Sequence, residues 1–130
     1  MDAIWNTLYD EAKKVLNPRK ISEWVEAGGV AAAIETASGN IYTGVCVDGA
    51  CTLGICAERN AIFNMITNGE SEIRRVIALN RDGKAMSPCG ACRELMTQLM
   101  PENYRGIEVM LDYEKGKVVT LGELTPQWWI

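Results

Sequence analysis

The chain has 130 residues, 48% of them hydrophobic, with 13 basic and 17 acidic side chains and a formal charge of −4. This length predicts one domain, residues 1–130, that is large enough to bury a hydrophobic core. The acidic balance argues against a nucleic-acid partner, because proteins that bind a phosphate backbone usually present a basic face.

The first half of the chain predicts a helix followed by a β-hairpin. Apolar residues recur at helical spacing over residues 2–16, and the helix ends before Pro18. Residues 30–36 and 41–47 have the apolar character of strands and are separated by a short turn that contains glycine. A loop at residues 48–55 leads into the second half.

The second half alternates helices with strands. Helices are expected at residues 56–67 and 89–100, and strands at 75–80, 108–112 and 117–120. Thr120 with Glu123 forms a capping-box pattern that starts a last short helix. The order of elements predicts an α/β fold, a three-layer α/β/α sandwich around a mixed sheet of about five strands.

The composition also indicates where the protein works. No apolar run is long enough to cross a membrane, and the first residues lack the basic and apolar regions of a signal peptide. The five cysteines show no disulfide-framework spacing. We therefore expect a reduced, cytoplasmic protein without a membrane partner.

Two short motifs, 33 positions apart, carry the chemistry: CAE at residues 56–58 and PCGAC at 88–92. Cys56, Cys89 and Cys92 suit a catalytic Zn²⁺, because three protein ligands leave the fourth tetrahedral position open. Both motifs fall at predicted helix starts, where unpaired N–H groups and the helix dipole favour thiolates. The chain contains no histidine, so Glu58 is the expected acid–base group beside the metal.

Other interpretations of the cysteines stay open. Cys46 and Cys51 are best explained as small buried hydrophobes. Cys89 and Cys92 have the spacing of a redox dithiol, although Pro88 precedes the pair instead of lying within it. A non-enzymatic alternative is a structural zinc site in which Cys51 or Cys46 is the fourth ligand, but a closed site leaves the nearby carboxylate without a role.

The two motifs resemble those of the cytidine deaminase family, including its blasticidin S deaminase branch. The resemblance is carried by CAER at residues 56–59 and SPCGACR at 87–93, and it extends from about Val30 onward. It implies the cytidine deaminase fold and hydrolytic deamination of a free cytosine-type nucleoside, cytidine or deoxycytidine, as in pyrimidine salvage. Blasticidin S or another amino-heterocycle is the alternative substrate. The resemblance also implies a homotetramer.

The resemblance implies a role for each motif residue. The three motif cysteines would bind Zn²⁺, with no organic cofactor. Glu58 would pass a proton from water to the ring nitrogen and then protonate the leaving amine. In similar proteins an arginine at the place of Arg59 donates hydrogen bonds to the thiolates, which offsets their negative charge. The backbone N–H of Ala57 is a candidate donor to the water or the departing group.

The residues at the expected substrate-contacting positions depart from the family pattern. Cytidine deaminases contact the sugar hydroxyls through an Asn and a Glu, and Cys46 and Asp48 take these places here. A thiol cannot replace the paired donor and acceptor of an amide, so we expect changed sugar recognition. The family also carries a Phe before its Val-Gly-Ala-Ala run, whereas residues 27–33 read AGGVAAA. These small residues leave room for a substrate bulkier than cytidine or for a closely packed helix.

The C-terminus supplies the last predicted contact. In relatives a terminal aromatic residue closes over the base, often from a neighbouring subunit of a tetramer, and Trp128 or Trp129 is the candidate here. Packing in the core or at a subunit interface is the alternative for both side chains.

Overall fold

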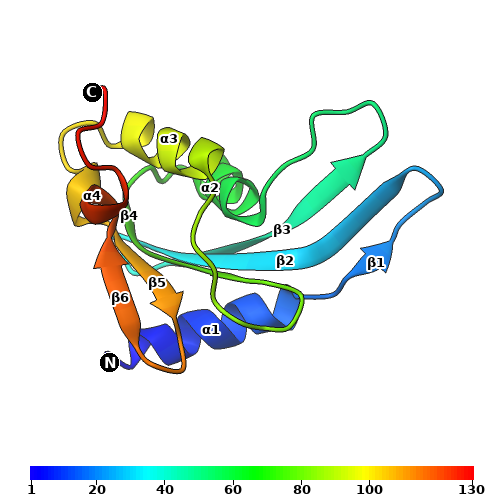
Figure 1. Cartoon of the computed structure of the whole chain (residues 1–130), viewed down its shortest axis with the longest axis horizontal. Helices are drawn as coiled ribbons and strands as arrows, with labels where there is room; N and C mark the ends of the chain where they lie inside the picture. The colour runs from blue at the N-terminus through cyan, green and yellow to red at the C-terminus, as the bar shows by residue number, and fades with distance from the viewer.

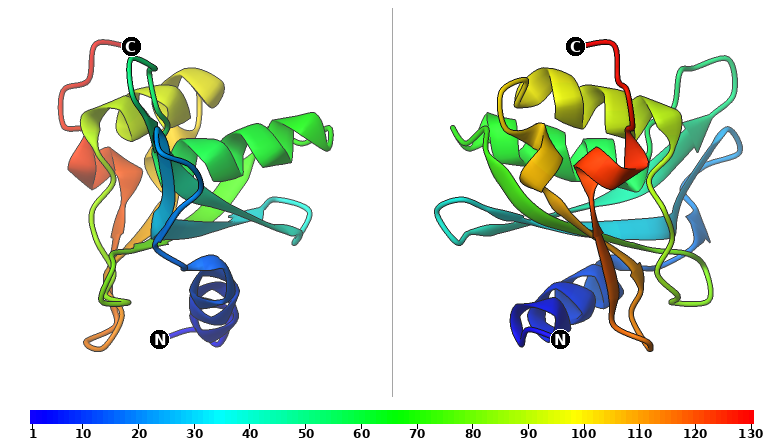
Figure 2. Two further views of the ribbon diagram at one scale, coloured as in Figure 1. Left: turned by 90° about the vertical axis from the view of Figure 1, so that its right-hand side faces the viewer. Right: turned by 60° about the vertical axis from the view of Figure 1, so that its left-hand side comes forward.

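Residues 1–130 form a mixed sheet of six strands with helices on both faces in the computed structural model (Figure 1). The helices are α1 (Ile4–Val15), α2 (Ala57–Thr67), α3 (Gly90–Leu99) and α4 (Leu121–Leu124), with a 3-10 turn η1 (Tyr104–Gly106). The strands are β1 (Arg19–Lys20), β2 (Val25–Thr36), β3 (Ile41–Gly49), β4 (Ile73–Leu79), β5 (Glu108–Asp112) and β6 (Lys117–Thr120). Helix α1 covers one face of the sheet, and the other helices lie on the opposite face (Figures 1 and 2). None of the helices is long and apolar enough to cross a membrane.

Strand β2 pairs with three other strands. Along one edge it pairs antiparallel with β3. Along the other edge, β1 pairs with β2 up to Ala27, and β4 pairs with it from Ala31 onward. Strand β5 is parallel to β4, and β6 is antiparallel to β5. Residues 28–30 of β2 therefore have no partner strand on the edge that β1 and β4 share.

Apolar side chains fill the space on both faces of β2. Ala32 and Ile34 belong to the larger core, beneath α2 and α3, whereas Ala33 between them packs with Trp5 and Leu8 of α1. A strand that is covered on both faces needs apolar residues at every position instead of every second one. This burial explains the continuous apolar run in the middle of the strand.

Gly44 of β3 allows α2 to pack closely on the sheet. A Cβ atom at this position would lie 2.3 Å from the backbone nitrogen of Ala61, so any larger residue would push the helix away. The first residues of α2, Ala57 and Glu58, line one cavity together with Val30 of β2.

The α/β class and the predicted order of elements are confirmed, with two differences. The strand expected at residues 30–36 already begins at Val25, because its pairing with β3 and β1 continues past two glycines. The sheet has six strands instead of about five, since Arg19–Lys20 forms the short strand β1. Both residues of β1 are exposed, so no apolar alternation marks it in the sequence.

Candidate catalytic metal centre

Three thiols from two helix starts converge at one point. The Sγ atoms of Cys56, Cys89 and Cys92 all lie within 4.8 Å of one another. The Cys56–Cys89 and Cys89–Cys92 Sγ–Sγ distances are both 3.3 Å. Cys92 is buried, Cys56 is half-buried and Cys89 is exposed. The cluster therefore has a closed side in the core and an open side toward solvent.

The local backbone explains why these side chains meet. Cys56 is the N-cap of α2 and Cys89 the N-cap of α3, both with extended backbone, and neither helix has a side-chain cap. The first N–H groups of each helix therefore remain available to a thiolate. Cys92 follows Cys89 by one helical turn, which brings it to the same face.

The thiols differ in how readily they ionise. Burial opposes ionisation of Cys89, but hydrogen bonds from the backbone of Cys92 and from the Cys92 and Cys56 thiols outweigh it and hold the pKa of Cys89 below its ordinary value. Burial and the negative charge of Glu58 raise the pKa of Cys92. Three soft sulfur donors in this arrangement fit Zn²⁺, and a coordinated thiol loses its proton.

Glu58 lies in the first turn of α2 and is only 3% exposed. Burial raises the pKa of Glu58, while its own backbone N–H and the charge of Arg59 lower it to a smaller extent. A carboxyl group with a raised pKa holds a proton more readily than an ordinary one, which suits a group that accepts a proton and returns it.

Arg59 contacts the thiol cluster as the resemblance implies. Its Nη2 donates a hydrogen bond to Cys56 Sγ at 3.4 Å. Its Nε is buried and has no partner. The guanidinium charge therefore lies beside sulfur atoms that would be negative when they bind a metal, which stabilises their ionised form.

A cavity of about 250 Å³ opens in front of the cluster, and we call it the catalytic pocket. Cys56, Cys89 and Glu58 line its wall, and so do Val30 and Asp48. Ala57 also lines it and is fully buried, so its backbone is held in place. The pocket thus brings two of the three predicted metal ligands and the predicted sugar-contacting residues to one space.

Cys46 lines this pocket but is already engaged, because its Sγ accepts a hydrogen bond from the backbone N–H of Val30 at 3.2 Å. Cys51 is exposed, so the prediction that it is a small buried hydrophobe is wrong, and neither it nor Cys46 belongs to the thiol cluster. The four-thiol arrangement is therefore not formed.

The C-terminal tryptophans are placed away from the pocket. Trp128 packs against the larger core, with its indole N–H buried and unpaired. Trp129 is 69% exposed and donates to Glu94 at 2.9 Å. Neither lines the catalytic pocket. The expected contact of Trp128 or Trp129 with a base therefore stays a prediction.

Sequence reasoning missed several pocket residues. The sequence marks Val30 only as a strand residue, and Leu53 and Met86 line the pocket from loops without any sequence pattern. The sole sequence signal for Met86 is its position just before the second cysteine motif.

Comparisons with known proteins agree with this geometry. The profile of the cytidine and deoxycytidylate deaminase zinc-binding region matches residues 8–104. The blasticidin-S deaminase of Bacillus cereus is 32% identical over 108 residues, which cover 75% of this chain and 74% of that protein. The cytidine deaminase of Halalkalibacterium halodurans is 30% identical over 101 residues, with the same coverage.

Among solved structures, the cytidine deaminase from Mycobacterium leprae has a TM-score of 0.78 and 28% identity, covering 97% of this chain and all of that one. The cytidine deaminase from Mycobacterium tuberculosis, at 22% identity and a TM-score of 0.79, shares the fold. The family profile covers most of the chain, and the three thiols lie in one cluster. The chain therefore belongs to the cytidine and deoxycytidylate deaminase family and is a zinc-dependent deaminase.

Proposed function

We propose that the protein hydrolyses the exocyclic amine of a free cytosine-type nucleoside, cytidine or deoxycytidine, and releases ammonia. The observation that carries this proposal is the cluster of three thiols, two of which, Cys56 and Cys89, line the catalytic pocket together with the buried Glu58. The family membership and the names of the matched relatives support the same chemistry.

The proposed metal ligands are Cys56, Cys89 and Cys92. When bound, Zn²⁺ supplies Lewis acidity that makes water a nucleophile near neutral pH. Arg59 stabilises the ionised thiols through its contact with Cys56 and offsets their excess negative charge.

Glu58 moves the protons. Its carboxylate takes a proton from the attacking water and delivers it to the ring nitrogen next to the amine-bearing carbon. It then takes the remaining proton of the hydroxyl added to that carbon and gives it to the amine, so the carbonyl forms, the carbon–nitrogen bond breaks and neutral ammonia leaves. The buried backbone N–H of Ala57 is the proposed donor that orients the water or the departing group.

The sugar of the substrate would lie in the part of the catalytic pocket that Cys46 and Asp48 line. Asp48 is exposed on β3 and can accept hydrogen bonds from sugar hydroxyls. Cys46 adds little to the binding of the sugar, because its sulfur already accepts a hydrogen bond from the N–H of Val30. Blasticidin S is the second candidate substrate, and the similarity to a blasticidin-S deaminase together with the missing amide favours it.

A homotetramer remains the proposed assembly. Apolar side chains are exposed where the β1–β2 turn and the β3–α2 loop extend beyond the body of the molecule (Figure 1). Trp24 is 66% exposed there and Leu53 fully so. Another copy of the chain would cover them. We propose a cytoplasmic location because the five free cysteines form no disulfide.

Ammonia release from cytidine by the zinc-loaded protein tests the function, with Glu58→Gln as the blank. We expect the substitution to lower the rate by about 10²- to 10⁴-fold while one zinc per chain is retained. Equal and negligible release by both proteins from cytidine, deoxycytidine and blasticidin S would contradict the proposal.

A further inference from the structure

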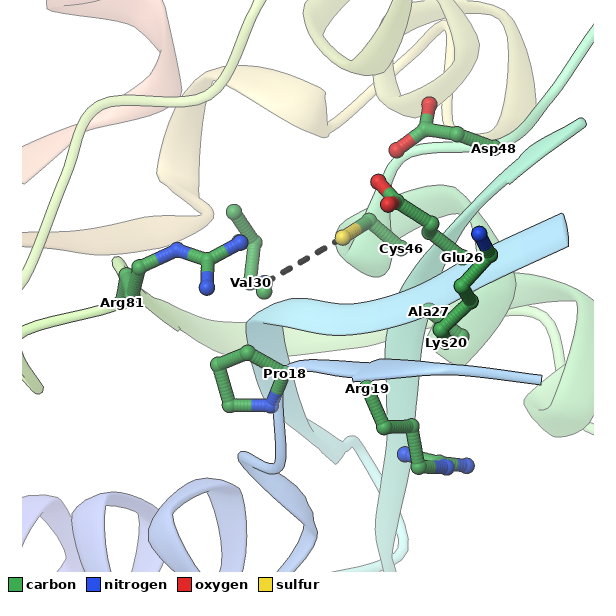
Figure 3. Close-up of a pocket in the computed structure, with 10 residues that line it drawn as sticks. Pro18, Arg19, Lys20, Glu26, Ala27, Val30, Cys46, Asp48 and Arg81 are labelled. Carbon is green, nitrogen blue, oxygen red and sulfur yellow. Dashed lines mark hydrogen bonds between the residues drawn. The ribbon is translucent and has the colours of Figure 1, made fainter. Parts of the chain in front are cut away.

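A second cavity, of about 480 Å³, adjoins the catalytic pocket, and we call it the side cavity (Figure 3). The two share Val30, Cys46 and Asp48 on their walls. None of these three residues belongs to the thiol cluster, and neither its cysteines nor Glu58 line the side cavity. A substrate whose ring lies at Glu58 would therefore pass its far end into the side cavity.

Two glycines of β2 lie next to the cavity, and one of them, Gly29, lines it. Gly28 has φ +83°, and a Cβ there would lie 2.1 Å from the carbonyl oxygen of Asn17. A Cβ on Gly29 would lie 3.2 Å from Nη2 of Arg81. The glycines thus occupy the stretch of β2 without a partner strand, and they leave the cavity open beside it.

The side cavity carries a net positive charge in an acidic protein. Three cations, Arg19, Lys20 and Arg81, line it, against the carboxylates of Glu26 and Asp48. Its formal charge is therefore +1, whereas the whole chain has −4. An anion is consequently better placed here than on most of the surface.

The cations of the side cavity differ in how they are engaged. Lys20 lies opposite Glu26 in the β1–β2 register, and Arg19 donates to the carbonyl of Asn17 at 3.0 Å. Arg81 follows the end of β4, and its guanidinium is directed toward Val30 (Figure 3). Its side chain makes no hydrogen bond, and the four ion pairs of the molecule involve other residues.

We propose that the side cavity binds an anionic group, a carboxylate or a phosphate, on the N1 substituent of the cytosine-type substrate, and that Arg81 holds it. This inference depends on the proposed function for the position of the ring. A guanidinium presents parallel N–H groups that match the oxygen pairs of either anion. A neutral ribose would end at the shared wall and leave Arg81 without a partner.

The test compares kcat/KM for cytidine, cytidine 5′-monophosphate and the 5′-carboxylic acid of cytidine, using the zinc-loaded full chain. We expect about tenfold or greater preference for at least one anionic substrate over cytidine. Arg81→Gln should abolish the preference, and Arg81→Lys should keep part of it. The matched control is Lys84→Gln, which removes one positive charge from the same loop outside the side cavity and should leave the preference intact.

The pattern of preference also identifies the anion. Preference for both anionic substrates supports a general oxyanion site, and preference for one identifies the phosphate or the carboxylate. The inference would be overturned if cytidine had a kcat/KM at least as high as both anionic substrates and if Arg81→Gln left the ratios of these kcat/KM values unchanged. The proposed function would still stand.

If no substrate releases ammonia, a binding measurement tests the anion site of the side cavity separately from the proposed deaminase function. Calorimetry would compare uridine with uridine 5′-monophosphate and with the 5′-carboxylic acid of uridine, on the wild type and on Arg81→Gln. Tighter binding of either anion that is lost in Arg81→Gln supports the side cavity although the proposed function has failed. No anion preference in binding rejects the inference as well.

Discussion

The two ends of the binding region are built from different parts of the fold. The metal end comes from the first turns of α2 and α3, and the proposed ligand Cys92 and the proposed acid–base group Glu58 are buried. The far end comes from strand β3 and the loop after β4, and its charged groups Asp48 and Arg81 are exposed. Buried groups on helix starts are held in one geometry, as bond-breaking chemistry requires. Exposed groups on strands and loops can change without disturbing the core, so specificity can differ while the reaction stays the same.

The largest expected effect is at the metal end. Cys92→Ala removes one of three ligands from the buried side of the cluster, so zinc per chain should fall close to zero. Deaminase activity should then drop by on the order of 10³-fold or more, since a metal supplies several kcal/mol of stabilisation. Metal analysis and ammonia release measure the two effects. Cys51→Ala, at an exposed thiol outside the cluster, is the matched control and should keep its zinc. Full zinc content in Cys92→Ala would refute the ligand set.

The guanidinium beside the cluster should have the next largest effect. Arg59→Met removes the hydrogen bond to Cys56, and we expect zinc affinity or activity to fall about 10- to 100-fold. Competition with a chelator measures the affinity. Arg74→Met removes an exposed arginine that donates to the Ala37 carbonyl, away from both ends, and should change neither quantity. Equal losses in the two variants would mean that net charge, and not this contact, is responsible.

The sequence predicts the metal end of the binding region far better than it predicts the far end. Helix starts, cysteine spacing and the capping box of Thr120 with Glu123 are local patterns, and the structure has the box with a 3.2 Å hydrogen bond from Glu123 N to Thr120 Oγ1. The side cavity depends on long-range pairing: β1 and β4 share one edge of β2 and leave a gap between them. No local pattern reports such a gap, so Arg81 has no signal in the sequence beyond its charge.

The far end offers a smaller and more selective change. Cys46→Asn restores the amide found in cytidine deaminases and keeps an acceptor for the N–H of Val30. One additional hydrogen bond to a sugar hydroxyl is worth about 1 kcal/mol, so KM for cytidine should fall roughly fivefold with kcat unchanged. Steady-state kinetics measure the effect. Cys46→Ser keeps the acceptor but supplies no amide, and should leave KM near the wild-type value. A higher KM in Cys46→Asn would show that this position does not face the sugar.

The smallest effect is expected outside both ends, where Glu70 after α2 accepts hydrogen bonds from Asn40 at 2.8 Å and Tyr42 at 2.7 Å. Hydrogen bonds from Asn40, Thr36 and Tyr42 lower the pKa of Glu70 to about 2. An unperturbed Glu has a pKa of about 4.3, so ionised Glu70 stabilises the fold above that pH. The contribution is lost as the pH falls through the folded-state value of about 2.

Glu70→Gln tests this interpretation through the pH dependence of urea unfolding. The midpoint should be lower than that of the wild type by a constant amount between pH 5 and 7, and the gap should close toward pH 2. Glu72→Gln is the control, because that exposed carboxylate accepts no hydrogen bond; a similar gap there would assign the effect to net charge. Deaminase rates at pH 7 should be unchanged in both variants, since neither residue lines the catalytic pocket or the side cavity. Loss of activity in Glu70→Gln would mean instead that the C-terminal end of α2 helps to position Glu58, which lies in the first turn of the same helix.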